Sequence, residues 1–336
     1  MYGSEGFELP QLLCEEYFKF LQIQEMKNTS MNKMLLLIVA VVLTQDLIAQ
    51  NRYTDSSVTC VAYWGRTDTR KFTFTKIKDK QLSDGSRTKS SISYDVSIKV
   101  LDSSATGYKL EWNQGNFSID GKDNQQNLAV SMLMSGIKFI YNTDDVGSFK
   151  ELLNWKEVRD FYVNMLKMQL SNTKQDGSAQ AALDKMMASL ATKESVEALM
   201  IREVQLLHSP YGLEYDKAGT MAETELPNLF GGKPFPATLK LSMASLLPSA
   251  DAASIIIFQQ VDKMKGRDAL VSIIQQFAGK SSAAEISEAI KTIDVSDKTT
   301  YSFHLSTGWV SRIEFVRKVD LGGALQEERY TMEAIR

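Results

Sequence analysis

The chain has 336 residues, of which 43% are hydrophobic and 24% are charged, and it contains only 6 Pro and 19 Gly. These proportions are typical of a globular protein and exclude collagen-like, disordered, coiled-coil and disulfide-scaffold classes. The 38 basic and 41 acidic residues give a net charge of -3, which excludes a nucleic-acid-binding protein that relies on bulk positive charge.

An apolar run early in the chain predicts export. The eleven residues Met34–Thr44 carry no charge and follow a lysine directly. A membrane-spanning helix needs about 20 apolar residues, whereas the apolar region of a secretory signal peptide needs about 7 to 15. Ala49 supplies the small residue that signal peptidase requires, so we expect a signal peptide over 31–49, cleaved between Ala49 and Gln50. The mature protein is then expected in the periplasm or outside the cell, with no stable membrane span after cleavage.

Residues 1–30 do not fit a signal peptide. They contain five glutamates against two lysines, whereas the start of a signal peptide is short and basic. A start at Met31 would place Lys33 directly before the apolar run. We therefore interpret 1–30 as a mis-assigned upstream extension, with a genuine N-terminal extension as the alternative. Loss of residues 1–49 would leave 35 basic and 35 acidic residues and Cys60 as the single cysteine, so no internal disulfide is expected.

Alternating apolar and polar residues predict antiparallel strands between Val58 and Ile119. The clearest stretch, Ser91–Val100, places five apolar side chains on one sheet face and five polar side chains on the other. Parallel strands buried on both faces have continuous apolar runs instead, so this strand is expected in an antiparallel sheet. The polar segment Asp102–Gly107 predicts a hairpin loop, and a further short strand is expected at Lys138–Tyr141.

The middle of the chain is expected to be helical. Asn154 followed by Glu157 has the form of a capping box, and an apolar helix face follows, formed by Trp155, Val158, Tyr162 and Met165. A weaker helix is expected around Ala179–Leu190. A second apolar stripe, which must end before Pro210, comprises Val196, Leu199, Met200, Val204 and Leu207.

Strands return from about Thr220. Further strands are expected at Thr238–Met243, Ser254–Gln260, Thr300–Leu305, Val310–Val319 and Glu328–Ile335, with helices at 270–279 and 282–290. This order of elements predicts an α+β fold in which an extended, curved antiparallel sheet, open like a half-barrel, packs against two helical insertions. No repeat or linker divides the chain, so a single domain over 50–336 is expected.

Searches for catalytic motifs are negative. The chain lacks a dinucleotide-binding G-x-G-x-x-G, a P-loop, a G-x-S-x-G elbow and an H-E-x-x-H motif. His208 and His304 are interpreted as structural histidines. The sequence therefore predicts no catalytic residue, no metal site and no cofactor.

Apolar side chains of the predicted helices are the remaining candidates for a binding site. Trp155, Tyr162 and Met165 share one helix face, and Val204 lies on the second stripe. Core packing is the simpler interpretation of such stripes, and a ligand cavity between helices and sheet is the functional one. The expected ligand is an apolar small molecule or a lipid; nucleic acid is not expected, and protein partners are left open.

Several motifs resemble a known family. They are the Tyr94–Trp112 hairpin, the Tyr141–Gly147 turn that leads to Trp155, and the Ser306–Trp309 hairpin, together with a signal ending in Ala-Gln. With these motifs the chain resembles exported Bacteroidota proteins of unknown function. Its layout is also similar to the periplasmic lipoprotein-carrier fold, which implies an open antiparallel half-barrel closed by helices around an apolar cavity.

The expected function is that of an exported, soluble, non-enzymatic binding module for a lipid or other apolar ligand. One alternative is a carboxylate-dependent hydrolase of glycans or envelope polymers, which would need a polar cleft with convergent acids. A second alternative is a structural or protein-interaction component of the cell envelope, which would expose an apolar patch or an unpaired sheet edge.

Overall fold

The computed structural model describes residues 53–82, 85–120, 132, 134–171, 184, 187–188, 190–226, 234–268, 270–271, 290–320 and 324–335. All of them belong to one compact unit, Arg52–Arg336. The predicted extension 1–30, the signal peptide 31–49 and the cleavage residues Ala49 and Gln50 lie outside the described residues. Most of the helices predicted at 179–190, 270–279 and 282–290 also lie outside them.

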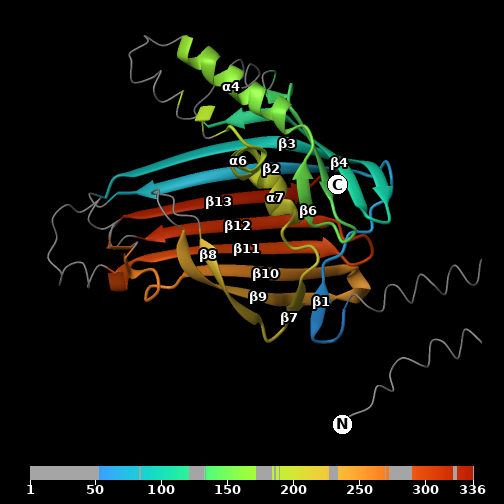
Figure 1. Ribbon diagram of the computed structural model, residues 1–336. Coiled ribbons are helices and arrows are strands. Elements are labelled where there is room, and N and C mark those ends of the chain that lie inside the picture. Colours follow the sequence, from blue (N-terminus) through green and yellow to red (C-terminus); the bar gives the residue numbers. More distant parts are fainter. Residues whose placement is uncertain are drawn as a thin grey trace, which may run out of the picture. The chain divides into compact units, whose positions relative to one another are not determined.

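Thirteen strands and three α-helices are assigned within these residues (Figure 1). The strands are β1 Ser57–Thr59, β2 Thr69–Gln81, β3 Arg87–Ser104, β4 Gly107–Ile119, β5 Lys138–Thr143, β6 Phe149–Leu152, β7 Glu214–Asp216, β8 Thr220–Leu226, β9 Phe235–Leu247, β10 Ala252–Val261, β11 Asp294–His304, β12 Val310–Asp320 and β13 Leu325–Ala334. The helices are α4 Trp155–Ser171, α6 Lys193–Met200 and α7 Arg202–His208, with a 3-10 turn at Pro248–Ala250.

Eleven of these strands form one open antiparallel sheet with the order β6-β5-β4-β3-β2-β13-β12-β11-β10-β9-β8. Strands β2 to β6 form one meander and β8 to β13 form another. The first strand of one meander pairs with the last strand of the other, from Leu325 opposite Gln81 to Ala334 opposite Phe72. The predicted α+β class with an extended antiparallel sheet is therefore confirmed.

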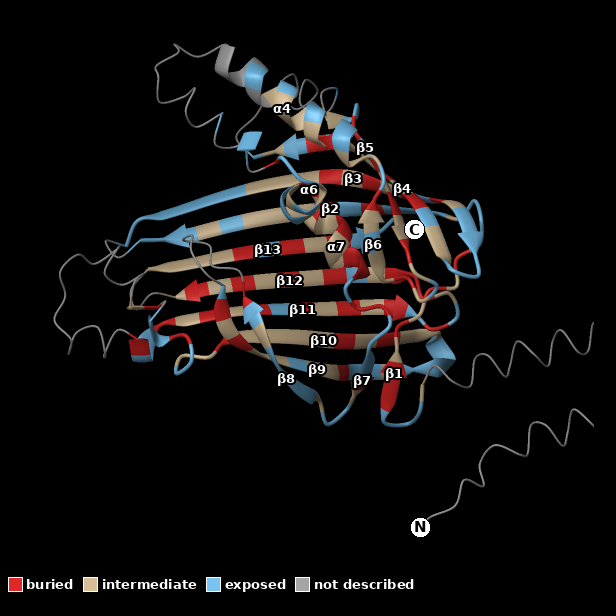
Figure 2. Ribbon diagram, in the orientation of Figure 1, coloured by how far each residue is buried: buried red, intermediate tan, exposed pale blue. Residues whose placement is uncertain are grey.

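One face of the sheet carries the core. In β3, Tyr94, Val96, Ile98 and Val100 are buried, while Asp95, Ser97 and Lys99 between them face the other side. The paired strands continue this layer, because Val96 lies opposite Phe72 and Ile98 lies opposite Trp112. Figure 2 shows the buried stretches of neighbouring strands in register and the exposed ends of β2 and β3.

The helices lie over this core face because of the strand order. β6 and β8 are the two edge strands, so the segment 153–219 must pass from one edge of the sheet to the other. In the described part of this segment, α6 and α7 lie in front of the central strands (Figure 1). Contacts fix α7 there, since the Tyr301 hydroxyl on β11 donates a hydrogen bond of 2.9 Å to the carbonyl oxygen of Leu206.

The second predicted apolar stripe, expected on one helix, lies on two short helices, α6 and α7. Ile201, with φ −123° and ψ 33°, is not helical and separates α6 from α7. Its side chain is fully buried, as are those of Val196 and Val204, so the break lets both short helices turn apolar side chains to the sheet. Leu199 was expected on the apolar face, but it is exposed, because α6 turns Val196 and not Leu199 to the core.

Asn154 joins the start of α4 to the sheet. Its side-chain oxygen accepts a hydrogen bond from Ile140 N (2.9 Å), and its amide donates to the Lys138 carbonyl (2.8 Å) and to Glu157 Oε2 (3.3 Å). The predicted capping pair therefore meets through its side chains, but Asn154 uses its acceptor on β5. The helix is thereby tied to the strand beside it.

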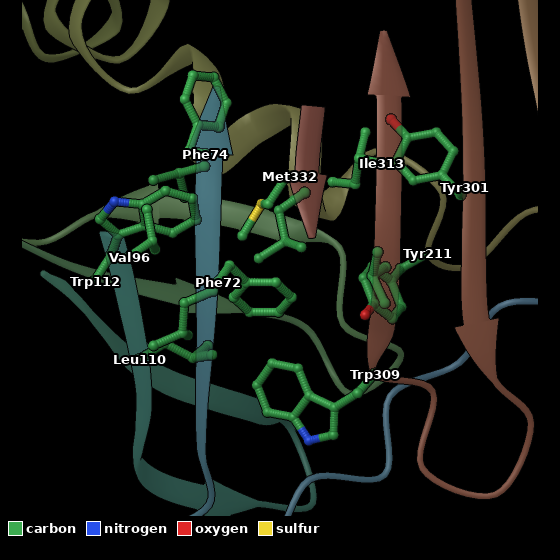
Figure 3. Packing of buried hydrophobic residues seen from close by; sticks show 14 of the residues in the cluster. Phe72, Phe74, Val96, Leu110, Trp112, Tyr211, Tyr301, Trp309, Ile313 and Met332 are labelled. Atoms are coloured by element: carbon green, nitrogen blue, oxygen red, sulfur yellow. The ribbon is translucent and has the colours of Figure 1, made fainter. Parts of the chain in front are cut away.

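Aromatic side chains from distant segments close one end of the core (Figure 3). Trp309 stacks on Trp64 with ring centroids 4.4 Å apart, and Trp64 packs edge-on against Tyr211 at 5.3 Å. The turn before Trp309 lies against the backbone of Val61, which follows β1. A Cβ on Gly308 would stand 1.9 Å from Val61 O. Gly308 also has φ +68°, so both its space and its backbone conformation require glycine.

Candidate functional site

A cleft of about 420 Å³ lies between the core face of the sheet and the helices. Strands β2, β3 and β4 form its floor. Tyr162 of α4, Met200 of α6, Glu203 of α7 and Met134 form its other wall. The floor residues are Phe74, Lys76, Lys78, Ser90, Ser91, Ile92, Tyr94, Gln114, Phe117 and Ile119. The volume is within the range of about 300–1,000 Å³ that ligand pockets occupy.

The cleft is apolar and aromatic at one end. Tyr94 stacks on Phe117 with centroids 4.7 Å apart and contacts Phe74 at 4.9 Å. Alternation along the strands puts these rings on one face, because Phe74 and Tyr94 are direct cross-strand partners. Ile92 and Ile119, also paired across strands, continue the apolar floor. An aliphatic or aromatic ligand group would be removed from water here.

The other end of the floor is cationic. Lys76 and Lys78 follow Phe74 on the same face of β2, and Lys78 is paired with Ser90 of β3. Both ammonium groups contact Oε1 of Glu328, at 3.4 Å from Lys76 and 3.3 Å from Lys78. Glu328 is 7% exposed, whereas 54% of the Lys78 side chain is exposed. The lysines therefore border the cleft while the carboxylate lies beneath them.

The charge network around the buried Glu328 extends to Arg202 of α7. Arg202 lies 3.8 Å from Glu328 and stacks on the rings of Tyr330 and Phe315, with its guanidinium carbon 5.2 and 5.3 Å from the ring centroids. Burial by itself raises the pKa of Glu328. Lys76, the Tyr330 hydroxyl, Lys78 and Arg202 outweigh that effect and hold this pKa below its ordinary value. Glu328 is accordingly a carboxylate at neutral pH.

A second buried ion pair lies on the same face. Arg317 donates two hydrogen bonds to Asp297, one of them from Nε to Oδ1 at 2.6 Å, and both residues are 5% exposed. Burial lowers the pKa of Arg317, but the bonds to Asp297 outweigh this and raise it. This pair stands between the main core and a smaller apolar cluster that includes Phe235, Val261 and Val319. It separates two apolar regions of one sheet face.

Tyrosine hydroxyls of the cleft remain protonated. Burial raises the pKa of Tyr162 to about 12, with a smaller effect of the Glu203 carboxylate. The pKa of Tyr94 is raised well above its ordinary value by the same two causes, burial first. At neutral pH both residues therefore act as hydrogen-bond donors and not as bases.

The four ligand residues expected from the sequence lie in different surroundings. Tyr162 lines the cleft. Trp155 and Met165 are partly buried and are not among the residues that line it; Lys156 and Arg159 lie over the Trp155 ring instead. Val204 is fully buried within the core cluster. A ligand role for these residues stays a prediction.

The lysines and the floor aromatics of the cleft were not foreseen as site residues. Their signal was present in part, since alternation put Phe74 and Tyr94 on an apolar face. What the sequence does not show is that Lys76 and Lys78 continue the same face beyond the apolar residues, toward Glu328 some 250 positions later. The register of β2 against β13, which pairs Lys78 with Glu328, brings these charged residues together.

Groups suited to other chemistry are also located. His208 is buried, its Nδ1 donates to the Gly147 carbonyl (2.7 Å), and Tyr141 Oη donates to its Nε2 (3.0 Å). The shifted carboxyl pKa values among the described residues are all lowered, at Asp79, Glu151, Glu194 and Glu328, the opposite of what a general acid needs.

Within the described ranges there is no cluster of three or more potential metal ligands. The helices of the described part include none with the length and apolarity to cross a bilayer.

Comparisons with known proteins give distant structural likenesses. No family model and no curated protein matches the chain. A lipovitellin chain, solved in work on lipid–protein interactions in lipovitellin, is similar with a TM-score of 0.38 and 7% identity over 82% of this chain. This chain spans only 26% of that chain's length. DynF from the dynemicin biosynthesis pathway of Micromonospora chersina gives a TM-score of 0.18 and 5% identity, covering 84% of this chain and 87% of that one. These weak resemblances carry no functional argument.

Proposed function

We propose that the protein is a non-enzymatic binding module for a lipid or another ligand with a large apolar part. The observation that carries this proposal is the cleft between the sheet and helices α4, α6 and α7, with Phe74, Tyr94 and Phe117 as its aromatic floor. Moving apolar ligand surface from water into such a cleft contributes about 25 cal/mol per Å².

The construction of the cleft supports binding. Its floor is a hydrogen-bonded antiparallel sheet, whose side-chain positions are fixed by the pairing of β2, β3 and β4. Its other wall includes Met134 and Met200, whose flexible thioethers adapt to irregular apolar shapes. A rigid floor facing an adaptable wall suits the binding of several related aliphatic ligands better than the binding of one compact molecule.

We also propose that the working protein is exported, with Gln50 as its first residue. This rests on the short apolar run Met34–Thr44 and the Ala49 that follows it. Mass spectrometry of the protein isolated from its native source is expected to show an N-terminal peptide that begins at Gln50. Any peptide from residues 3–24 would contradict the interpretation of 1–30 as a mis-assigned extension.

Native mass spectrometry of the purified protein tests the binding function. We expect adducts of defined mass that disappear after extraction with organic solvent, and lipids in the extract. The delipidated protein is then expected to bind N-phenyl-1-naphthylamine, an uncharged probe that fluoresces in apolar surroundings. Absence of both adducts and probe binding would sink the proposal.

A further inference from the structure

We propose that the ligand of the cleft is an amphiphile with an anionic head, which is bound at Lys76 and Lys78 while its apolar part lies along Ile92 toward Tyr94. This inference rests on the proposed function, since it assigns the ligand class of the same cleft. Both lysines and both apolar residues line the cleft.

The polarity of the floor changes in one direction. Phe74 and Tyr94 form one cross-strand pair, and Lys78 and Ser90 form another, four residues further along the same two strands. At about 3.3 Å per residue, these pairs lie roughly 13 Å apart. The floor therefore has an apolar end and a cationic end, separated by the length of a short aliphatic chain.

Positive charge exceeds negative charge around the cationic end. Lys76, Lys78 and Arg202 all contact the single carboxylate of Glu328. Because a lysine ammonium has three N–H donors, each of the two lysines keeps donors for a ligand after its contact with Glu328. Glu328 is buried under them, so a head group that enters the cleft meets ammonium groups and not this carboxylate.

The cleft has one further carboxylate, that of Glu203 in α7. Its charge contributes to the raised pKa values of Tyr94, Tyr162 and Tyr330. A negative head at the Tyr94 end would be repelled by Glu203 and would lack a cation. The charge distribution thus favours one orientation, with the head at Lys78 and Ser90.

Displacement of N-phenyl-1-naphthylamine by three ligands with the same chain tests the head group. The ligands are dodecanoate, dodecanol and dodecyltrimethylammonium, used below their micelle-forming concentrations. We expect dodecanoate to bind at least about tenfold more tightly than dodecanol, the size of one charge-assisted hydrogen bond. The cationic compound should bind most weakly, because it is repelled by the lysines.

Variants locate the effect in the cleft. Lys78→Met keeps the aliphatic stem without the charge. We expect it to lower the affinity for dodecanoate about tenfold while leaving the affinity for dodecanol unchanged. Lys78→Arg should restore most of the preference for the anion. Lys298→Met is the matched control: it removes one charge from an exposed lysine on the opposite face of the sheet and should leave all three affinities unchanged. Thermal unfolding of each variant checks that it is folded.

The outcomes separate the two proposals. Equal affinities for dodecanoate and dodecanol, or an anion preference that survives Lys78→Met, would overturn the head-group inference and leave the apolar binding function intact. Failure of every ligand to displace the probe from the cleft, or failure of the probe to bind, would overturn both.

Discussion

The Tyr141 hydroxyl donates a hydrogen bond to Nε2 of His208 across 3.0 Å, although 67 positions separate the two residues in the chain. The imidazole is completed by its own bond to the Gly147 carbonyl, so both ring nitrogens are satisfied in the neutral form. Burial lowers the pKa of His208 to about 4, against the partly opposing effect of the Gly147 carbonyl. The histidine is therefore a neutral link between β5, the turn at Gly147 and α7.

The lowered pKa of His208 predicts a loss of stability in mild acid. Its folded-state pKa of about 4 lies below the ordinary value of 6.5, so the unfolded chain binds this proton more readily. The stabilisation is fully present above about pH 6.5 and is lost as the pH falls toward 4, by up to roughly 3 kcal/mol. Urea unfolding across this pH range measures it.

Two variants isolate the contribution of this histidine. His208→Gln does not titrate and should lose that part of the pH dependence, while being less stable than the native protein at neutral pH. Tyr141→Phe keeps the buried imidazole and should keep the pH dependence with a lower overall stability. Equal slopes for His208→Gln and the native protein would show that the acid sensitivity arises from other groups.

The buried Arg317–Asp297 pair predicts strong coupling between the two side chains. Asp297→Asn leaves the guanidinium without its counter-charge and should cost about 3–5 kcal/mol of unfolding free energy. The double variant Asp297→Leu with Arg317→Met removes both charges and should be more stable than Asp297→Asn. A double-mutant cycle with the single variants Asp297→Leu and Arg317→Met and their double variant, followed by urea unfolding, measures the coupling, and additive effects would contradict it.

The close packing at Gly308 predicts that one added methyl group lowers the stability of the fold. Gly308→Ala places a Cβ against the Val61 carbonyl at a φ of +68°, so it should cost at least about 2 kcal/mol. Gly115→Ala in β4 is the control, because a Cβ there meets nothing within 4 Å and its φ is not positive. Comparable losses in the two variants, measured by chemical denaturation, would rule out the close approach as the cause.

Filling the cleft should weaken apolar binding. Met200→Trp puts a larger side chain into the wall beside Tyr162. It should lower the affinity for N-phenyl-1-naphthylamine by tenfold or more, about 1.4 kcal/mol of binding free energy. Met221→Trp, on the exposed edge strand β8, makes the same change away from the cleft and should leave binding unaltered. Fluorescence titration compares them; unchanged affinity in a folded Met200→Trp protein would place the probe elsewhere.

The sheet was largely predictable from the sequence. Strict alternation in Ser91–Val100 and the polar segment Asp102–Gly107 predict a hairpin through local chemistry, and β3 and β4 form it. The loop is shorter than predicted, because Asp102–Ser104 still pair with β4. Three-residue strands such as β1 and β7 were missed, because their pairing depends on distant partners and leaves no periodic pattern. The break at Ile201 was also missed, since burial of its side chain against the sheet outweighs the helical periodicity around it.

The cleft was predictable only in part. Helical periodicity identifies Tyr162 and Val204 equally as members of apolar faces. Whether such a side chain meets packed atoms, as Val204 does, or borders a cleft, as Tyr162 does, depends on where the crossing segment lies over the sheet. The Lys76–Glu328 contact depends on the β2–β13 register, which no local pattern encodes.

The pairing of β2 with β13 makes the order of synthesis matter. A ribosome produces roughly 5–20 residues per second, so β2 emerges roughly 10–50 s before its partner strand. Until β13 is available, the flank of β2 offers unsatisfied backbone groups to any passing strand. A chaperone that shields β2 until β13 can pair with it would therefore protect the chain from incorrect strand pairing.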